Sequence, residues 1–115
     1  MKYELKKGGF SAVIESRGGE LISFRDPEGR EYIWSGNPAY WPGRNPLLFP
    51  IVGNLENGAV RFGGVTYEMG RHGFARDNDF ALVEQGEDFI VLELCENETT
   101  LAKYPLRRRK NTKRV

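Results

Sequence analysis

Alternating apolar and polar residues occur in short runs along the first part of the chain, and glycines separate these runs. Residues 3–6 and 10–15 lie on either side of Gly8-Gly9, and residues 21–25 follow with near-regular alternation. A period of two indicates strands that bury one face, and a glycine pair indicates a tight turn. Pro27 and Gly29 mark a further turn, so residues 31–34 are predicted to return as another strand.

Prolines and glycines interrupt the middle of the chain. Residues 35–46 hold three prolines and two glycines, a density that excludes regular elements and predicts a long shaped loop. The apolar run 47–53 is predicted to be a buried strand that is bent or begun at Pro50. Asn57-Gly58 and Gly63-Gly64 are tight-turn dipeptides, and the residues between them alternate, which predicts a hairpin.

The last regular elements are expected at residues 80–94 and 97–104. The first is a predicted hairpin that turns at residues 85–88, and the second is a helical turn capped by Asn97 or Thr99. No segment has an apolar period of 3.6 that is long enough to require a helix. About seven to eight short strands therefore indicate an all-β fold, an antiparallel β-sandwich or part of one, in a single domain over residues 1–105.

Charge is distributed unevenly along the chain. Residues 107–115 hold six of the 17 basic residues and no acidic one, which leaves 11 basic and 16 acidic residues in the body. We expect residues 106–115 to be a separate basic tail, either disordered or of frame-shifted origin. Basic tails can bind nucleic acid, but no aromatic residue interleaves with this one and the body is acidic, so no nucleic-acid partner is expected.

The cysteine count and the hydropathy of the chain indicate the compartment in which the protein works. The single cysteine, Cys95, excludes an intrachain disulfide and a cysteine-rich metal site, which favours a reducing compartment. The first residues lack a signal-peptide pattern, and no run approaches the roughly 18 apolar residues of a membrane span. We therefore expect a cytoplasmic protein with no membrane partner and no metal.

Candidate chemistry falls on two loop clusters, because the common nucleotide, zinc and nucleophile motifs are missing from the sequence. The first cluster holds Trp41, Arg44 and Asn45, and the second, residues 71–77, holds His72 and Arg76. Sugars are bound by aromatic ring faces together with planar donors such as arginine and histidine. Histidine can also transfer a proton near neutral pH. The second cluster is therefore a candidate sugar-binding or phosphate-binding corner.

Simpler interpretations stay open for these residues. A lone histidine is more often a turn or surface residue, Arg76 and Asp77 can form a weak local ion pair, and tryptophans are most often core or lid residues. The carboxylates between residues 84 and 98 alternate in part with apolar positions. This pattern is typical of the solvated face of a hairpin rather than of a catalytic pair.

Two segments in this order, "PLLFPIVG" at residues 46–53 and "HGFARD" at residues 72–77, resemble the aldose 1-epimerase (galactose mutarotase-like) family. The branch in question includes LacX-type proteins and hexose-6-phosphate mutarotases, and the resemblance runs from about residue 10 to residue 105. It implies the amino-terminal part of an antiparallel β-supersandwich. It also implies a reaction that interconverts the α and β anomers of a hexose or hexose phosphate, with no cofactor.

The same resemblance implies roles for individual residues. Arg44, His72 and Arg76 match substrate-binding positions, and His72 would assist the reaction. Two positions depart from the family, because Arg71 stands where glutamine is common and Asn54 stands where arginine is common. Both departures bear on which sugar is preferred.

Relatives in this family are longer, and their general-acid histidine and general-base glutamate lie beyond the matched region. The chain has one histidine. The expectation is therefore a truncated isomerase that lacks the general acid and base and is inactive alone. The alternative is a non-catalytic carbohydrate-binding or partner-binding β-sandwich module. Part of a sandwich leaves unpaired strand edges, so self-association through these edges is also expected.

Overall fold

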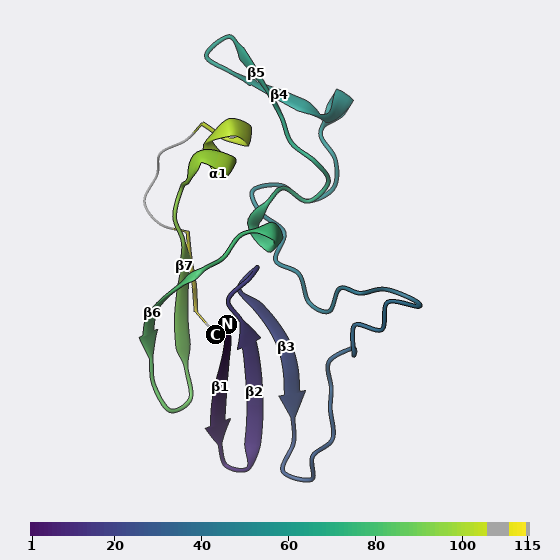
Figure 1. The fold of residues 1–115 in the computed structure, drawn as a ribbon, viewed down its shortest axis with the longest axis vertical. Helices are drawn as coiled ribbons and strands as arrows, with labels where there is room; N and C mark the ends of the chain where they lie inside the picture. The colour runs from purple at the N-terminus through teal and green to yellow at the C-terminus, as the bar shows by residue number, and fades with distance from the viewer. Residues whose placement is uncertain (106–110, 115) are drawn as a thin grey trace.

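The first three strands form one antiparallel sheet. The computed structural model describes residues 1–105 and the backbone of Asn111–Arg114. Strands β1 (Lys2–Lys7), β2 (Phe10–Glu15) and β3 (Glu20–Arg25) pair in chain order (Figure 1). The β1–β2 hairpin turns at Gly8-Gly9, where both glycines have positive φ, as the sequence predicts.

The register of this sheet separates an apolar face from a polar one. Leu5 lies opposite Ala12, and Ile14 lies opposite Leu21, so these side chains share one face. Leu5 and Ile14 are buried. Glu4 belongs to the other face, because successive residues of a strand point to opposite sides. The apolar face is the one that carries the core.

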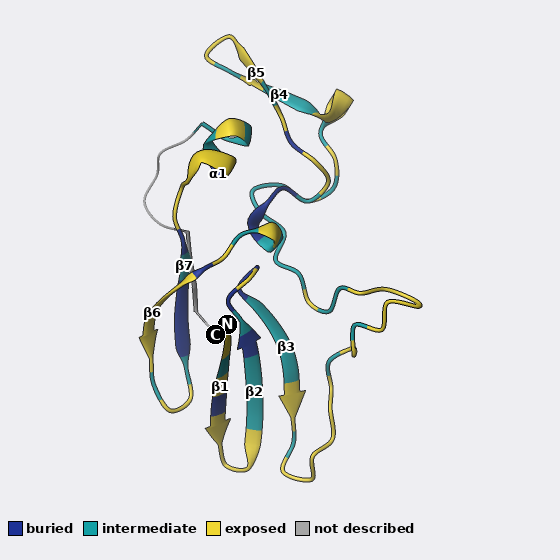
Figure 2. Ribbon diagram, in the orientation of Figure 1, coloured by how far each residue is buried: buried dark blue, intermediate teal, exposed yellow. Residues whose placement is uncertain are grey.

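A second three-stranded sheet comes from the end of the chain. Strands β6 (Ala81–Gln85), β7 (Ile90–Leu94) and β8 (Asn111–Arg114) lie in that order, with β7 in the middle. Figure 2 shows β7 buried along most of its length, whereas every residue of the edge strand β6 is exposed. The predicted hairpin over residues 80–94 is confirmed.

The structure differs in part from the expected disordered tail over residues 106–115. Four of its residues, Asn111–Arg114, pair with β7 because the inner strand offers them its second edge. These four residues are therefore a strand rather than a disordered segment. Residues 106–110 and 115 lie outside the described part of the chain, and the frame-shifted origin of the tail stays a prediction.

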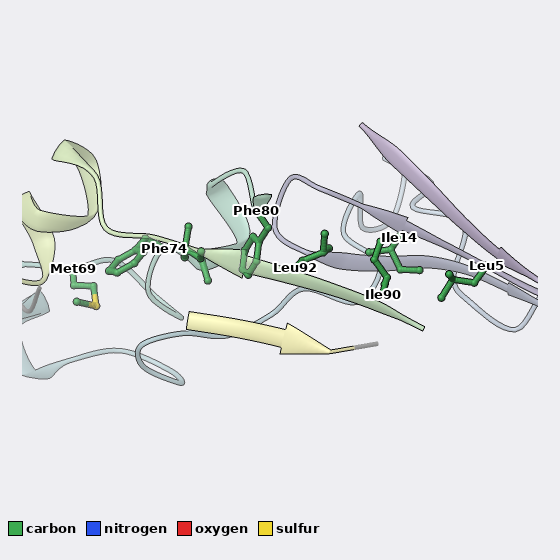
Figure 3. Close-up of a cluster of buried hydrophobic side chains, with 9 residues drawn as sticks. Leu5, Ile14, Met69, Phe74, Phe80, Ile90 and Leu92 are labelled. Atoms are coloured by element: carbon green, nitrogen blue, oxygen red, sulfur yellow. The ribbon is translucent and has the colours of Figure 1, made fainter. Parts of the chain in front are cut away.

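The two sheets pack against each other around one apolar cluster. Ile14 of the first sheet lies beside Ile90 of the second, and the cluster runs on through Phe80 toward Phe74 (Figure 3). Its buried members are Leu5, Ile14, Met69, Phe74, Ala75, Phe80, Ile90, Leu92 and Leu94. The predicted all-β, antiparallel sandwich is therefore confirmed.

Shorter elements join the two sheets. Strands β4 (Ala59–Phe62) and β5 (Val65–Glu68) form the predicted hairpin around Gly63-Gly64. In the described part of the chain, the other elements are two 3-10 turns, η1 (Glu56–Gly58) and η2 (Ala75–Asp77), and one helix, α1 (Glu98–Lys103). Within the described residues, no helix is long and apolar enough to cross a membrane.

The helix α1 begins at the predicted cap. The Asn97 side chain accepts a hydrogen bond from the Thr100 backbone N–H (2.9 Å), and the Thr100 hydroxyl accepts one from the Asn97 N–H (2.9 Å). This reciprocal capping box satisfies two donors that the first turn would otherwise leave free. Asn97 rather than Thr99 is therefore the cap.

The predicted strand at residues 31–34 is wrong. These residues keep one bridge, between Arg25 and Glu31. The Glu31 carboxylate accepts the backbone N–H groups of Phe24 (2.9 Å) and Ile33 (3.0 Å), so a side chain takes donors that a strand ladder would use. Trp34 then turns into the loop 35–46, where its Nε1–H donates to the Trp41 carbonyl (2.7 Å).

The predicted buried strand at residues 47–53 is also wrong. The segment is mostly half-buried and keeps a single bridge, from Phe49 to Gly73. Pro50 has no N–H to donate to a ladder. The segment therefore does not enter a sheet and runs alongside residues 71–77, where Phe49 bridges to Gly73. The Phe49–Pro50 peptide bond is cis.

Candidate functional site

The two sequence motifs, residues 49–54 and residues 71–77, lie side by side, and we call them together the His72 corner. The carbonyl of Phe49 accepts hydrogen bonds from the backbone N–H groups of Phe74 (2.9 Å) and Ala75 (3.1 Å). Gly73 has a φ of 72°. A Cβ atom at Gly73 would lie 2.2 Å from the Phe49 oxygen, so only glycine permits this approach.

Gly53 and His72 form a second link within the corner. The backbone N–H of His72 donates to the Gly53 carbonyl (2.8 Å), and the Gly53 N–H donates to His72 Nδ1 (2.8 Å). His72 adopts a φ of 63°, which is uncommon for a residue other than glycine. Both hydrogen bonds hold the imidazole in one orientation despite this backbone conformation.

The Gly53 bond also decides the tautomer of His72. A neutral imidazole has one acceptor nitrogen, and the Gly53 N–H can only donate, so Nδ1 accepts and Nε2 carries the proton. Arg71 Nε lies 3.1 Å from His72 Nε2, but both atoms are then donors. We therefore treat this contact as a close approach of a guanidinium to an N–H group rather than as a hydrogen bond.

The charge state of His72 follows from its surroundings. Burial of the ring, and then the positive charges of Arg71 and Arg76, lower the pKa of His72 below the usual value of 6.5. At pH 7 the imidazole is therefore neutral. In this state it offers one N–H donor, at Nε2, beside two guanidinium groups.

Arg76 is anchored to the backbone of the same corner. Its Nη2 donates to the carbonyl of Arg71 (3.2 Å). The interpretation of Arg76 and Asp77 as a local ion pair is wrong, because the ion pairs among the described residues do not include Arg76. Within the described residues, no carboxylate neutralises Arg76, so its positive charge belongs to this corner.

The turn between β2 and β3, at Gly18-Gly19, packs against residues 76–80 and so supports the His72 corner. The N–H of Gly18 donates to the Asn78 carbonyl (2.7 Å), and a Cβ atom at Gly18 would lie 3.0 Å from the Arg76 carbonyl oxygen. A Cβ atom at Gly19 would meet the Phe80 ring at 3.1 Å. Sequence reasoning missed the role of Gly18 and Gly19 in packing under η2.

Aromatic rings form the floor of the corner. Phe49 packs edge-on against Phe74 (6.4 Å, 85°) and against Tyr104 (6.4 Å, 81°), and Phe74 also contacts Tyr104 (6.2 Å). Edge-to-face pairs at these distances are favourable beyond the area they bury. The loop carrying His72 thus packs on a cluster of three aromatic rings.

Arg44 is held at a different place, against the outer edge of β3. Its Nη1 donates to the Ile22 carbonyl (3.2 Å). Glu20 Oε2 accepts the backbone N–H groups of Asn45 (2.7 Å) and Arg44 (3.3 Å). Glu20 therefore positions Arg44, which sequence reasoning missed because its partners lie 24 and 25 residues away.

The remaining candidate, Asn54, follows Gly53 directly and is exposed. The structure thus brings Arg71, His72 and Arg76 to one corner, and Asn54 lies there because its neighbour Gly53 is bonded to His72. No hydrogen bond or ion pair among the described residues joins Arg44 to this corner. Residues 1–105 also contain no group of three or more histidine, cysteine or carboxylate side chains placed to hold a metal.

Comparison with known proteins identifies the family. The family model described as aldose 1-epimerase matches residues 1–109. The plasmid-encoded and chromosomal LacX proteins of Lactococcus lactis subsp. lactis are both 35% identical to the chain over 109 residues, which is 90% of this chain and 36% of each relative.

Solved structures agree with this match. A galactose mutarotase related enzyme from Lactobacillus acidophilus has a TM-score of 0.90 and 36% identity, over 100% of this chain and 38% of that one. A galactose mutarotase-like protein from Lactobacillus casei has a TM-score of 0.89 and 33% identity over the same shares. The chain spans little more than a third of the length of these proteins, and over that span it belongs to the aldose 1-epimerase family.

Proposed function

We propose that the His72 corner is part of a carbohydrate site, and that the chain binds a hexose or a hexose phosphate. The binding residues would be Arg44, Asn54, Arg71, His72 and Arg76. The observation that carries the proposal is the pair of hydrogen bonds between Gly53 and His72, which leaves Nε2–H as an oriented donor. Membership of the aldose 1-epimerase family supports a sugar as the ligand.

Anomer interconversion needs two proton transfers. A base takes the proton of the anomeric hydroxyl, and an acid protonates the ring oxygen, so the ring opens and closes on the other face. Arg71, His72 and Arg76 supply donors only, because guanidinium groups do not give up protons near neutral pH and Nδ1 of His72 is occupied by Gly53. These groups can stabilise negative charge that develops on a sugar oxygen.

His72 would therefore assist the reaction rather than carry protons, and the chain on its own would bind sugar without accelerating mutarotation. The positive charges of Arg71 and Arg76 would favour a phosphorylated hexose over a neutral one. In this proposal the general acid and the general base are not among the residues of the His72 corner.

The test is an NMR titration of the ¹⁵N-labelled chain with glucose, galactose and glucose 6-phosphate, combined with polarimetry. We expect shifts at the amides of Gly53 and His72 with dissociation constants of about 1 mM, and no rate above the uncatalysed one. His72→Ala should abolish the shifts, whereas Arg61→Ala, on the separate β4–β5 hairpin, should leave them. Absence of shifts with all three sugars would contradict sugar binding.

A second candidate function is a non-catalytic carbohydrate-binding module. The absence of a free proton acceptor among Arg71, His72 and Arg76 favours it, since these three groups bind but do not relay protons. Polarimetry separates the two functions: a rate well above the uncatalysed one would show catalysis and exclude the module.

A further inference from the structure

Asn78, the residue that follows η2, uses both ends of its side-chain amide. Its Nδ2 donates a hydrogen bond to the Phe74 carbonyl (2.7 Å), and its Oδ1 accepts one from Asn97 Nδ2 (3.3 Å). Its backbone N–H donates to the Ala75 carbonyl (3.2 Å), and its carbonyl accepts the Gly18 N–H (2.7 Å). Asn78 therefore joins the end of η2 to three segments: the loop that precedes η2, the cap of α1 and the turn between β2 and β3.

The orientation of each amide in this network follows from its backbone partner. The Thr100 N–H can only donate, so Asn97 turns Oδ1 toward it and Nδ2 toward Asn78. The Phe74 carbonyl can only accept, so Asn78 turns Nδ2 toward it and Oδ1 toward Asn97. The two assignments agree, because the network ends on a backbone donor at one side and on a backbone acceptor at the other. We call the two side chains the Asn78–Asn97 relay.

The relay ends on a residue that connects the two motifs of the His72 corner. Phe74 donates its N–H to the Phe49 carbonyl (2.9 Å), and its own carbonyl accepts the Asn78 amide. The Phe74 ring also contacts Tyr104, the residue that follows α1 (6.2 Å). Helix α1 therefore holds Phe74 in two ways, through the relay at its first turn and through the Tyr104 ring at its end.

The backbone before Phe74 needs support of this kind. His72 and Gly73 have φ values of 63° and 72°. A residue other than glycine keeps a positive φ only where the surrounding structure determines it. The two bonds with Gly53 hold His72 on one side. On the other side the chain is fixed at Phe74, two residues further on, and Asn78 supplies one of the bonds that fix it.

From these contacts we propose that Asn78 is a positioning residue of the His72 corner, which acts through Phe74 and holds the imidazole so that it presents Nε2–H. The position requires an asparagine, because it needs a donor toward Phe74 and an acceptor toward Asn97. The importance of this role for binding rests on the proposed function of the corner. The role itself belongs to the free chain, so it is tested without sugar, and the two proposals can fail separately.

The test is an NMR comparison of Asn78→Asp with the unaltered chain at about pH 7.5, where the His72 ring is neutral. The aspartate keeps the acceptor and removes the donor. We expect exchange of the Gly53 amide to accelerate roughly fivefold relative to that of Leu92 in β7, as loss of one hydrogen bond implies. The ¹⁵N signals of the ring should show the Nδ1–H tautomer mixed with the Nε2–H tautomer, because Gly53 no longer holds Nδ1 as its acceptor.

Three further variants separate the relay from added charge and from general effects of the substitution. Asn78→Ala adds no charge and should act in the same direction. Asn97→Asp keeps the acceptor that caps α1 but loses the donor to Asn78, so it should have a smaller effect of the same kind, because this contact is longer and exposed. Asn37→Asp is the matched control in the loop 35–46. Its Oδ1 accepts the Ala39 N–H (3.0 Å), which aspartate also does, so it should change neither measurement.

Two results would overturn the proposal. One is unchanged Gly53 exchange and an unchanged tautomer in folded Asn78→Asp and Asn78→Ala. The other is equal acceleration at Gly53 and Leu92 with an unchanged tautomer, which would assign Asn78 a role in stability alone. Circular dichroism identifies variants that have lost the fold. If both Asn78 variants have lost it, Asn97→Asp decides, and unchanged exchange and an unchanged tautomer in that variant would reject the relay.

Discussion

Gly53 and His72 hold each other by two hydrogen bonds of 2.8 Å, one between their backbones and one from the Gly53 N–H to the imidazole. A ring that would otherwise turn freely on a loop is thereby set to present Nε2–H. The same relationship ties the proline-containing segment 47–53 to residues 71–77. The orientation of the His72 imidazole and the path of the segment 47–53 therefore depend on the same two hydrogen bonds.

The titration of His72 tests the electrostatics of this corner. Arg71→Gln removes one of the positive charges that lower the pKa of His72, so the pKa should rise toward 6.5. The ¹H NMR signal of the ring reports it without ambiguity, because the chain has one histidine. Arg61→Gln, on another hairpin, should not move the titration. A pKa that falls in Arg71→Gln would contradict the assignment.

Replacement of Gly73 tests the contact between the two motifs. Gly73→Ala would place a methyl group 2.2 Å from the Phe49 oxygen, so the two segments would have to separate. We expect a loss of more than about 3 kcal/mol in the free energy of unfolding, measured by urea denaturation. The control is Gly64→Ala, which has a similar φ of 80° but no atom within 4 Å of the added methyl. Its cost should be about 1 kcal/mol, and equal losses would contradict the contact.

Glu20 is expected to control the place of Arg44. Glu20→Ala removes the acceptor of the Arg44 and Asn45 N–H groups, so hydrogen exchange of the Asn45 amide should accelerate by roughly tenfold, as loss of about 1.4 kcal/mol of protection implies. Glu28→Ala, at the exposed turn after β3, serves as the control. Unchanged exchange at Asn45 would show that other contacts hold the loop.

Acid stability should depend on Glu31. Burial raises the pKa of Glu31, but hydrogen bonds from Ser23, Arg25 and two backbone N–H groups outweigh it and bring the pKa to about 2, against a usual 4.5. A carboxyl group with a lowered pKa stabilises the folded state above pH 4.5, and that contribution is lost as the pH falls toward 2. Glu31→Gln should flatten the stability curve in this window, followed by urea denaturation at each pH. Glu68→Gln should leave the slope unchanged.

Hairpins could be predicted from the sequence because their signals are local. Gly8-Gly9 and Gly63-Gly64 adopt positive φ between alternating runs, and both turns lie where expected. The two incorrectly predicted strands, at residues 31–34 and 47–53, also failed for identifiable physical reasons. Residues 31–34 are apolar enough for a strand, but the Glu31 carboxylate competes for the backbone donors, and no pattern of hydropathy reveals such competition.

The candidate site was predictable only as a pair of motifs. Resemblance to a family indicated that the segments around Phe49 and His72 belong together, and the structure places them in direct contact. The sequence could not reveal the supporting residues Glu20 and Gly18. Their partners are backbone atoms far along the chain. Because almost every residue has the same backbone N–H and carbonyl groups, the residue types do not reveal which of them is the partner.

The bond between the Trp34 indole and the Trp41 carbonyl has a practical consequence for spectroscopy. These are the only two tryptophans in the chain, and both stand partly exposed at the loop 35–46. Intrinsic fluorescence will therefore report the environment of this loop, next to Arg44, and will respond weakly to changes in the sheets. Fluorescence is therefore the better optical signal for ligand binding near Arg44, whereas circular dichroism follows the sheets.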